Sequence, residues 1–351
     1  MKLNLTPGFT IENFSKPYII AEIGSNHNGD MELARKIIDA AVESGAHAVK
    51  FQSWTPQSLI AKEEYGANTV YTDDPKKHWG SLREMVEEYY LRDEQHHELN
   101  DYCKSKGVDF CSTPFSEEEA DLLLELNVPF FKVASMDINN LRLLRYLANT
   151  GKPVILSTGM ATMGEIEQAV LTIEETGNRN IGLLHCVSVY PPEMETINLR
   201  NITTLQDAFG YPVGFSDHTI GSAIPLASVA LGACLIEKHF TIDKDLPGWD
   251  HMISANPEEM RMIVKESENI VAAIGSARRI ISETEKKKMP KMRRSIVTTK
   301  PLKKGETVTA DHLAFKRPGT GISPDREQFV TGRKVNRDIE ADAVLRWSDF
   351  E

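Results

Sequence analysis

Short apolar runs alternate with amphipathic stretches along most of this chain of 351 residues. Eight such runs follow one another, from YIIAEIGSNH near the start to LIEKHF past the middle, and they are rich in valine, isoleucine and phenylalanine. Runs of this kind predict buried parallel strands, and the stretches between them have the periodicity of helices. Eight strand–helix units predict an α/β fold whose strands close into a (β/α)₈ TIM barrel.

Local signals place the ends of several helices. Helices are predicted over residues 31–44, 116–126, 141–149, 163–175 and 257–274. Thr162 and Glu165 have the spacing of a capping box at the start of one of them. Left-handed caps are expected at glycines that follow helices, namely Gly45, Gly107, Gly151 and Gly177. Residues 1–17 precede the first strand and are expected to form a small hairpin that plugs the barrel bottom.

The pattern changes near residue 280, which predicts a second domain. The charged stretch 283–294 contains EKKKMPKMRR, and Pro290 is expected to break any helix there. Short apolar runs and Gly/Pro turns follow, in enough residues for one small compact domain. The predicted organisation is a barrel over 1–280, a linker over 281–293 and a small domain over 294–351.

One connection is unusually long. Between Gln52 and Ser81 lie 28 residues without clear periodicity, and a loop of that length in a compact domain is typically functional or disordered. On a barrel it would lie beside the active-site rim. Its aromatic side chains make a substrate lid or a partner-contact surface equally acceptable interpretations: Trp54, Tyr65, Tyr71, His78 and Trp79.

Nearly every apolar run ends in a polar residue, and a barrel gathers these ends into one ring where its active site lies. His218 ends the seventh run and His239 the eighth. Adjacent strands lie about 4.8 Å apart, so two imidazoles at neighbouring ends can reach one ion. A histidine pair with open positions suits Mn²⁺ or a similar divalent cation. By strand alternation Glu237 faces the same way as His239, and Lys238 points oppositely.

Lysines and hydroxyls at the other strand ends indicate an anion site. Lys50 and Lys132 lie within apolar runs, where a lysine is costly unless it is paired. They are either salt-bridged structural residues or point charges for a phosphate or carboxylate. Small hydroxyls at neighbouring ends could complete a phosphate cradle: Ser135, Ser157, Ser188 and Ser216. Glu22 ends the first run and could act as an acid or base, or pair with a helix N-terminus.

Composition limits the class of protein. The formal net charge of −11 argues against a general nucleic-acid surface, so an anionic substrate would need a local cluster of lysines. The four cysteines show no C-x-x-C spacing, which favours buried thiols in a reducing compartment. No apolar run reaches about 18 residues, so no membrane association is expected and a cytoplasmic location is predicted.

The strings EIGSNHNG, KFQ, STPFS, KVAS, STGM, HCVSVYPP, GFSDHT and GACLIEKHF resemble the sialic acid synthase family along nearly the whole chain. The tail, with KKGE, DHL and KRPGTGI, is similar to that family's C-terminal antifreeze-like (SAF) domain. The resemblance implies a TIM barrel followed by a SAF domain. It also implies a domain-swapped homodimer in which the SAF domain of one subunit caps the barrel of the other.

The resemblance further implies condensation of phosphoenolpyruvate with an N-acylated mannose-type sugar, giving a nine-carbon 2-keto-3-deoxy acid and phosphate. His218 and His239 would hold the divalent metal, manganese in first place and magnesium or cobalt as alternatives, and Glu22 would act beside the metal and the aldehyde. The residues implied for phosphoenolpyruvate are Lys50, Thr113, Lys132, Ser135, Ser157, Ser188 and Ser216. Those implied for the sugar are Gln52, Tyr190, Asp250 and, in the SAF domain, Arg317.

Departures from the family pattern leave the sugar open. The strings KFQSW and CVS, with Trp54 and Ser188, differ from the KHQTH and CTN of many N-acetylneuraminate synthases and resemble the pseudaminic and legionaminic branches. PGWD nevertheless keeps the spacing of the neuraminate branch's PGPD. N-acetylmannosamine or a related sugar is the first candidate, and a diacetamido-trideoxyhexose is the alternative. More remote alternatives are a Schiff-base aldolase using Lys132 and a non-catalytic carbohydrate-binding protein.

Overall fold

Eight parallel strands form a nearly closed barrel, as predicted. The computed structural model describes residues 1–67 and 81–351. Its barrel strands are β3 (Tyr18–Glu22), β4 (Ala48–Ser53), β5 (Asp109–Pro114), β6 (Phe131–Val133), β7 (Val154–Ser157), β8 (Ile181–Cys186), β9 (Val213–Asp217) and β10 (Leu235–His239). Their hydrogen-bonded order is β5-β4-β3-β10-β9-β8-β7-β6. The two ends of this order, β5 and β6, pack against each other.

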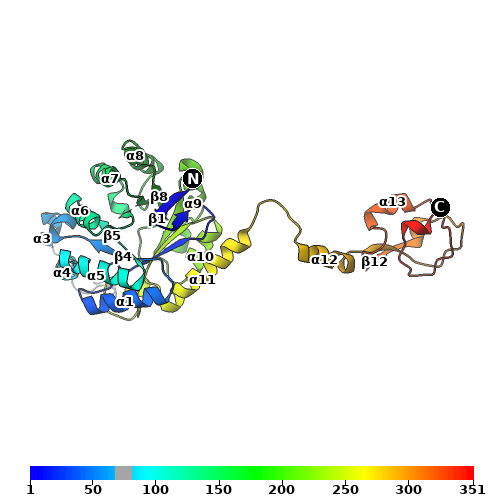
Figure 1. Ribbon diagram of the computed structural model, residues 1–351, viewed down its shortest axis with the longest axis horizontal. Helices are drawn as coiled ribbons and strands as arrows, with labels where there is room; N and C mark the ends of the chain where they lie inside the picture. The colour runs from blue at the N-terminus through cyan, green and yellow to red at the C-terminus, as the bar shows by residue number, and fades with distance from the viewer. Residues whose placement is uncertain (68–80) are drawn as a thin grey trace. The chain divides into compact units, whose positions relative to one another are not determined.

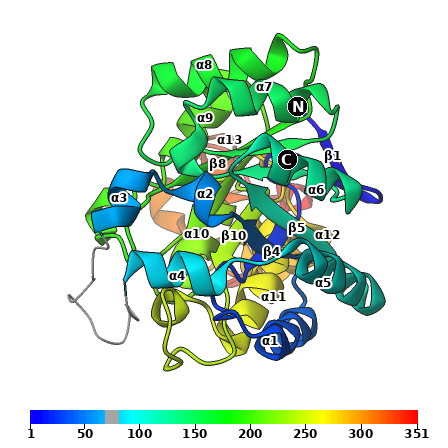
Figure 2. The same cartoon turned by 90° about the vertical axis from the view of Figure 1, so that its left-hand side faces the viewer.

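Helices surround the strands (Figure 2). They are α1 (Met31–Glu43), α5 (Asp93–Lys106), α6 (Glu117–Glu125), α7 (Leu141–Asn149), α8 (Met163–Glu174), α9 (Asn201–Phe209), α10 (Ala223–Ala230) and α11 (Pro257–Ile274). The five predicted helices agree with these bounds to within one residue at each end. The capping box of α8 is present, with Thr162 accepting from the Glu165 amide. Gly107 caps α5 at φ 72° in the left-handed region, and the other three predicted glycines also have positive φ.

A small antiparallel hairpin closes the bottom of the barrel, as expected. It consists of β1 (Leu3–Thr6) and β2 (Phe9–Ile11), beside the N-terminus in Figure 1. Leu3, Leu5 and Ile11 are buried in one cluster with residues from the beginnings of the barrel strands. Burying these side chains excludes water from that end of the barrel.

The inward face of the barrel changes from apolar to polar along the strands. Near the hairpin it is built from Ile20, Ala48, Cys111, Phe130, Ile155, Leu184 and Leu235. Two residues further along the same strands stand Glu22, Lys50, Thr113, Lys132, Ser157, Cys186 and Glu237, all buried. Because side chains two apart point to the same face of a strand, the barrel has an apolar floor and a polar mouth.

The segment after β4 is only partly the open loop that was expected. It contains the short helices α2 (Pro56–Leu59) and α3 (Lys62–Ala67), and α4 (Leu82–Tyr89) follows it. Trp54 is not available for a lid, because it is buried against Val86 and Tyr89. Tyr65 lies under the Arg83 guanidinium, 4.9 Å from its ring centre. Tyr71, His78 and Trp79 lie outside the described residues.

The chain divides into two compact units, Met1–Gly275 and Ser276–Glu351. In the second, β11 (Ser295–Thr298) pairs antiparallel with β12 (Leu313–Lys316), and α13 (Glu327–Val330) helps to cover a small core. Short 3₁₀ turns complete both units at Ser135–Asp137, Met194–Thr196, His251–Ile253, Ala310–His312, Pro324–Arg326 and Trp347–Asp349. No helix in the described part of the chain has the length and apolar character needed to cross a membrane.

The prediction that Pro290 prevents a helix is wrong. Helix α12 (Glu283–Met292) runs through it. A capping box between Ser282 and Glu285 starts this helix. Pro290 lies in the last turn, where its missing N–H removes one hydrogen bond, and the Arg293 amide still bonds the Met289 carbonyl at 2.9 Å.

Candidate active site

A cavity of about 270 Å³ opens at the polar mouth of the barrel. Twelve of the fourteen predicted site residues line it: Glu22, Lys50, Gln52, Thr113, Lys132, Ser135, Ser157, Ser188, Tyr190, Ser216, His218 and His239. All eight barrel strands, or the loops that directly follow them, contribute to its wall. The fold therefore gathers into one site residues that are up to 217 positions apart, from Glu22 to His239.

Two buried lysines and two buried carboxylates alternate across the cavity. Lys50 Nζ lies 2.9 Å from Glu22 Oε2 and 3.8 Å from Glu237 Oε2. Lys132 Nζ lies 3.5 Å from Glu237 Oε1, which also accepts a 2.9 Å bond from Ser216. The sequence allowed two interpretations of these lysines, as salt-bridged residues or as point charges for an anion. The structure agrees with both, because the lysines are ion-paired and also line an open cavity. An incoming anion can compete with the carboxylates for these ammonium groups.

Glu237 is a member of this site that the sequence-based list of candidates omitted. Glu237 is two positions before His239 on the same strand, so both side chains face inward. A carboxylate inside an apolar strand is costly unless it has a partner. Apart from Cys186, which is described below, the further omissions line the cavity from the connections that follow the strands: Phe115, Ala134, Met136 and Met160. No strand alternation predicts the direction of a loop side chain.

The two carboxylates have different proton affinities. Burial raises the pKa of Glu22 to about 7, with Lys50 opposing and Glu237 adding to the rise. Gln52 Nε2 donates to Glu22 Oε1 at 3.0 Å and fixes the carboxyl in place. Burial would also raise the pKa of Glu237, but Lys132 and Lys50 outweigh it and lower that pKa. Glu22 is therefore the carboxyl able to hold and release a proton near neutral pH.

The two lysines also differ. Burial opposes the charge of Lys50, but Glu22 and Glu237 outweigh it and raise its pKa. For Lys132 burial prevails and lowers the pKa, although Glu237 opposes the shift. A bound anion beside Lys132 would restore the preference for the charged ammonium.

Hydroxyls converge on the far side of the lysines. The Gly159 amide donates to Ser135 Oγ at 3.1 Å, and an added Cβ on Gly159 would lie 2.4 Å from Ser188 Oγ and 2.7 Å from Ser135 Oγ. Only glycine lets the backbone approach these hydroxyls so closely. Ser157 Oγ is buried and, among the described residues, has no hydrogen-bond partner. A buried hydroxyl without a partner indicates a ligand or water that completes its bonding.

His218 and His239 stand together, with ring centres 5.5 Å apart. His218 Nδ1 lies 2.8 Å from the Val187 carbonyl, so the tautomer that donates this bond leaves Nε2 as a bare acceptor. Burial lowers the pKa of His239 well below its usual value, and its Nδ1 has no hydrogen-bond partner in the described part of the chain. Burial would lower the pKa of His218 as well, but Cys186 and the Val187 carbonyl outweigh burial and raise it. A divalent cation would therefore take the place of a proton on His218 and would bind the neutral His239 directly.

The histidine pair is an incomplete ligand set by itself. The described residues contain no group of three or more histidine, cysteine or acidic side chains placed to hold a metal. A cation here would take its remaining ligands from water or substrate oxygens, which suits a catalytic ion with open positions. Tyr190 packs on His218, with ring centres 3.9 Å apart, and covers one side of the pair.

Cys186 belongs to the cavity wall, although its sequence context indicated only a buried structural thiol. Burial would raise its pKa, but His218, Ser135 and Lys132 outweigh burial and lower it. The signal in the sequence was its parity with Leu184, which places both side chains on the inward face.

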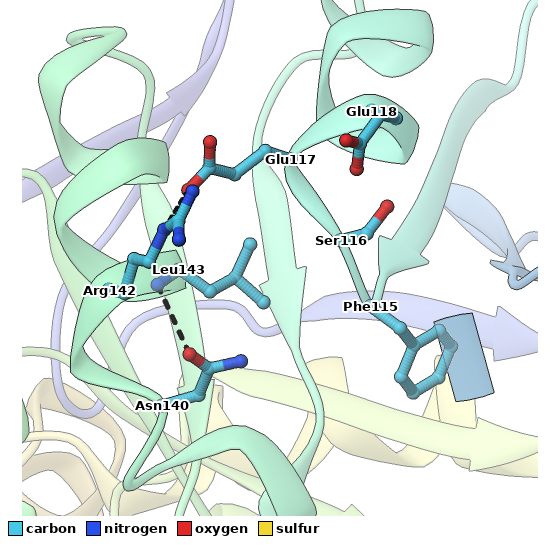
Figure 3. A pocket seen from close by; sticks show the side chains of 7 residues that line it. All are labelled: Phe115, Ser116, Glu117, Glu118, Asn140, Arg142 and Leu143. Carbon is cyan, nitrogen blue, oxygen red and sulfur yellow. Dashed lines mark hydrogen bonds and ion pairs between the residues drawn. The ribbon is translucent and has the colours of Figure 1, made fainter. Parts of the chain in front are cut away.

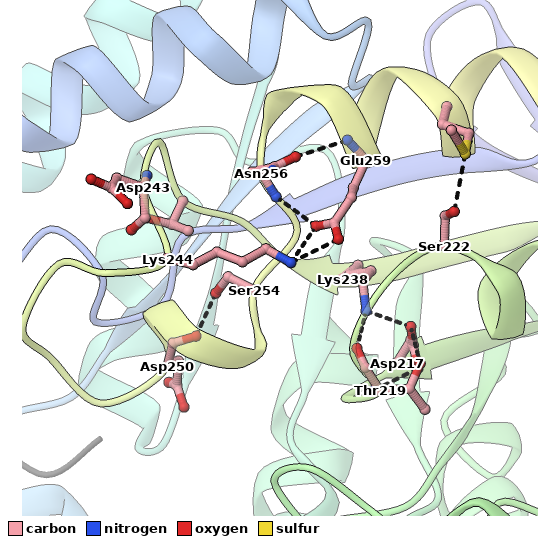
Figure 4. Close-up of polar contacts among 12 residues, drawn as sticks. Asp217, Thr219, Ser222, Lys238, Asp243, Lys244, Asp250, Ser254, Asn256 and Glu259 are labelled. Atoms are coloured by element: carbon pink, nitrogen blue, oxygen red, sulfur yellow. Dashed lines mark hydrogen bonds and ion pairs between the residues drawn. The ribbon is translucent and has the colours of Figure 1, made fainter. Parts of the chain in front are cut away.

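Two predicted residues do not line the cavity. Asp250 follows β10, where its carbonyl accepts a bond from Ser254 Oγ at 2.6 Å (Figure 4). Its Oδ2 lies 3.7 Å from His239 Nδ1, so it borders the histidine pair from outside the cavity. Arg317 is exposed just after β12 in the second compact unit. The prediction that Arg317 meets the sugar involves a second subunit and stays a prediction.

A second hollow, of about 220 Å³, lies between the starts of α6 and α7 (Figure 3). It shares Phe115 with the barrel mouth. Arg142 is paired with Glu117 at 2.7 Å, and Asn140 caps the Leu143 amide at 3.3 Å. Because these polar groups already bond one another near the surface, the mouth with its unsatisfied groups is the candidate active site.

Comparisons with known proteins cover both units. Residues 37–279 match the NeuB family. Residues 293–351 match the SAF domain.

Similar proteins cover nearly the whole chain. N,N'-diacetyllegionaminic acid synthase of Campylobacter jejuni subsp. jejuni serotype O:2 is 42% identical, over 94% of this chain and 99% of that protein. N-acetylneuraminate-9-phosphate synthase of Mus musculus is 35% identical, over 100% of this chain and 97% of that protein. The crystal structure of N-acetylneuraminic acid (sialic acid) synthetase from Leptospira borgpetersenii serovar Hardjo-bovis, in complex with citrate, is similar with a TM-score of 0.73. It is 35% identical, and the match covers 82% of this chain and 95% of that one.

Proposed function

The chain belongs to the NeuB family, and from this premise we propose that it condenses phosphoenolpyruvate with the aldehyde form of an N-acylated amino sugar. The products are a nine-carbon 2-keto-3-deoxy acid and phosphate. The observation that carries the proposal is the convergence of Lys50, Lys132 and the buried Ser157 with the histidine pair in one cavity. Cationic and hydroxyl groups suit an anionic enol ester, and the histidines suit an ion that activates an aldehyde.

Phosphoenolpyruvate is the anion for which the cavity is prepared. Lys50 and Lys132 would meet its carboxylate and phosphate, and their existing bonds to carboxylates keep them in position until it arrives. Thr113 accepts from Lys50 at 3.2 Å and extends the same wall. The hydroxyls around Gly159, together with Ser216, would complete the phosphate cradle.

His218 and His239 would hold a divalent cation, for which we propose manganese, with magnesium or cobalt as alternatives. Such an ion supplies a Lewis acid for the aldehyde oxygen. Glu22, in register with His239 on the neighbouring strand, would give a proton to that oxygen. The C2=C3 double bond of phosphoenolpyruvate supplies the electron pair for the new bond from C3 to the aldehyde carbon, and water adds at C2. The C2 hydroxyl then becomes the keto group as the bond from C2 to the phosphate oxygen breaks, and its proton leaves with the phosphate. The proton released by the water restores Glu22.

Within this reaction class, the sugar with two acylamino groups gains support from two observations. The diacetyllegionaminic acid synthase is 42% identical to this chain, whereas the mouse enzyme is 35% identical. Ser188, one of the departures from the neuraminate pattern, lines the cavity. Trp54, the other, is buried away from it. We therefore propose a diacetamido-trideoxyhexose as substrate and retain N-acetylmannosamine as the competing candidate.

A phosphate-release assay tests the proposed function. Purified protein with Mn²⁺ and phosphoenolpyruvate should release phosphate only when an acceptor sugar is added. A panel of N-acetylmannosamine, its 6-phosphate, mannose and diacetamido-trideoxyhexoses should give the highest kcat/KM with a diacetamido sugar. Phosphate release that is equal with and without sugar, or absent with every sugar, contradicts the proposal. If the highest kcat/KM is found with N-acetylmannosamine, the proposed reaction stands and only the proposed sugar is wrong.

Lys132 provides the reason to examine a Schiff-base aldolase as a second candidate, because burial lowers its pKa. An amine that loses its proton easily can attack a carbonyl. Borohydride added during turnover would then trap substrate on Lys132, and activity would persist in EDTA. The proposed synthase should show neither result.

The capping of one subunit's barrel by the other's SAF domain is also part of the proposal. Arg317→Ala should raise KM for the sugar tenfold or more, on the order of 1.4 kcal/mol, while KM for phosphoenolpyruvate changes little. Arg333→Ala, in the same unit, is the matched control. In heterodimers that combine Arg317→Ala with His218→Ala, one intact composite site should recover part of the activity. Verified heterodimers without recovery would contradict a shared site.

A further inference from the structure

A fully buried ion pair joins the two strands that bear the histidines, and the proposed chemistry does not use it. Asp217 precedes His218, and Lys238 precedes His239. Lys238 Nζ lies 2.6 Å from Asp217 Oδ2, and both side chains have 0% exposure. Figure 4 shows the lysine directed at Asp217 and Thr219. By strand alternation this pair lies on the opposite face of the strands from the cavity.

The contacts of the pair close the turn that carries His218. Lys238 Nζ donates to the Thr219 carbonyl at 2.5 Å as well as to Asp217. Asp217 Oδ1 accepts from the Thr219 amide at 2.9 Å, and Oδ2 accepts from the Thr219 hydroxyl at 3.1 Å. The backbone on both sides of His218 is therefore tied by side chains to the residue before His239.

Backbone hydrogen bonds alone do not hold the two histidines together. The pairing of β9 with β10 ends at Asp217 and Lys238, one residue before the imidazoles. His239 is still held on its other side, where it pairs with Glu22 of β3. His218 lies beyond the last residue of β9. Its distance from His239 thus depends on the turn that Lys238 anchors, together with the 2.8 Å contact of its Nδ1 with the Val187 carbonyl.

On the inner face the same strands are joined by the 2.9 Å bond from Ser216 to Glu237. That bond belongs to the cavity and can change when a ligand arrives, whereas the outer pair is shielded from every ligand. Burying two charges gives little net stability, and the best-attested role of such pairs is to fix one register. The pair of Asp217 and Lys238 has the hydrogen bonds, and the position next to His218 and His239, needed to fix how the two histidines stand relative to each other.

We propose that Asp217 and Lys238 are positioning residues that set the spacing of His218 and His239, and thereby the affinity for the divalent cation. The proposal rests on the metal site of the proposed function. Residues that orient metal ligands from behind change metal affinity by about 10- to 100-fold when they are mutated. The anion-binding lysines lie on other strands, β4 and β6, and of the proposed phosphate cradle only Ser216 lies on β9, so phosphoenolpyruvate binding should depend on the pair much less than metal binding does.

The test is titration calorimetry of the metal-free full-length protein with MnCl₂, and separately with phosphoenolpyruvate. Lys238→Met should raise the Mn²⁺ Kd about 10- to 100-fold and leave the phosphoenolpyruvate Kd within about twofold. The double variant Asp217→Asn/Lys238→Met removes both charges. If it loses as much Mn²⁺ affinity as Lys238→Met does, the effect comes from the spacing of the histidines and not from an unpaired carboxylate. Lys238→Arg keeps the charge and should recover part of the affinity. Lys152→Met, which removes a lysine bonded to the Val128 carbonyl and lies before β7, is the control for general destabilisation.

Thr219→Val keeps the experiment decisive if the charge variants do not fold, because it deletes only the hydroxyl bond to Asp217. It should weaken Mn²⁺ binding more than phosphoenolpyruvate binding. Folded variants with unchanged Mn²⁺ affinity, or with equal losses for both ligands, overturn the positioning role and leave the proposed reaction untouched. A wild type that binds no Mn²⁺ overturns the metal site and the positioning role together.

Discussion

His218→Ala and His239→Ala should each lower kcat by about a thousandfold or more and abolish retention of a divalent cation. Each variant removes one of the two protein ligands proposed for the ion. A Lewis acid contributes several kcal/mol to the stabilisation of developing charge, and about 4 kcal/mol corresponds to a thousandfold in rate. Wild-type protein in EDTA should lose activity to the same level and regain it with added Mn²⁺. Phosphate release under substrate saturation measures the rate, and elemental analysis after dialysis measures the metal.

The matched control is His47→Ala. His47 is half-buried and burial lowers its pKa to about 4, but it stacks on Tyr18 just before β4, at the amino-terminal end of the barrel. Its loss should lower stability and leave metal content unchanged. Full activity of the wild type in EDTA, or full activity of either histidine variant, would remove the metal from the proposal.

Much of the barrel and its mouth could be predicted because one rule governs both. Ile20 and Glu22, or Leu235 and Glu237, are two positions apart and face the same way, so the change from apolar to polar along a run marks the mouth. The same rule separates His239, which lines the cavity, from Lys238, which faces away from it. Where side chains follow strand alternation, the candidate site was predictable.

The sequence-based predictions failed where tertiary packing or a connection between strands determines the position of a side chain. Trp54 was considered for a lid because it is one of the aromatic residues in the long connection after Gln52, but packing against Val86 and Tyr89 buries it. Pro290 was expected to break any helix in its segment, yet α12 runs through it and ends two residues later, at Met292. Met136 and Met160 reach the cavity from the connections after β6 and β7. These outcomes depend on distant residues that local pattern does not specify.

Glu22→Gln should lower kcat by about 10²- to 10⁴-fold, the range typical of a lost general acid–base group. The amide keeps the shape of the side chain and can still contact Gln52, so substrate affinity should change little. Lys50 retains Glu237 at 3.8 Å as a partner. Glu119→Gln is the matched control, because burial also raises the pKa of Glu119 but its carboxylate bonds Ser58 and the Phe115 amide outside the cavity.

The pH profile shows whether Glu22 acts as the acid. The donor form is the protonated one, and burial raises the pKa of Glu22 to about 7. Below that pH the carboxyl holds its proton; as pH rises through about 7 the proton is lost, and kcat/KM of the wild type should fall. Glu22→Gln should lack this alkaline limb, and Glu119→Gln should retain it. If kcat/KM of the wild type instead falls as the pH is lowered through about 7, the carboxylate is the required form, and Glu22 would be the base for the first step.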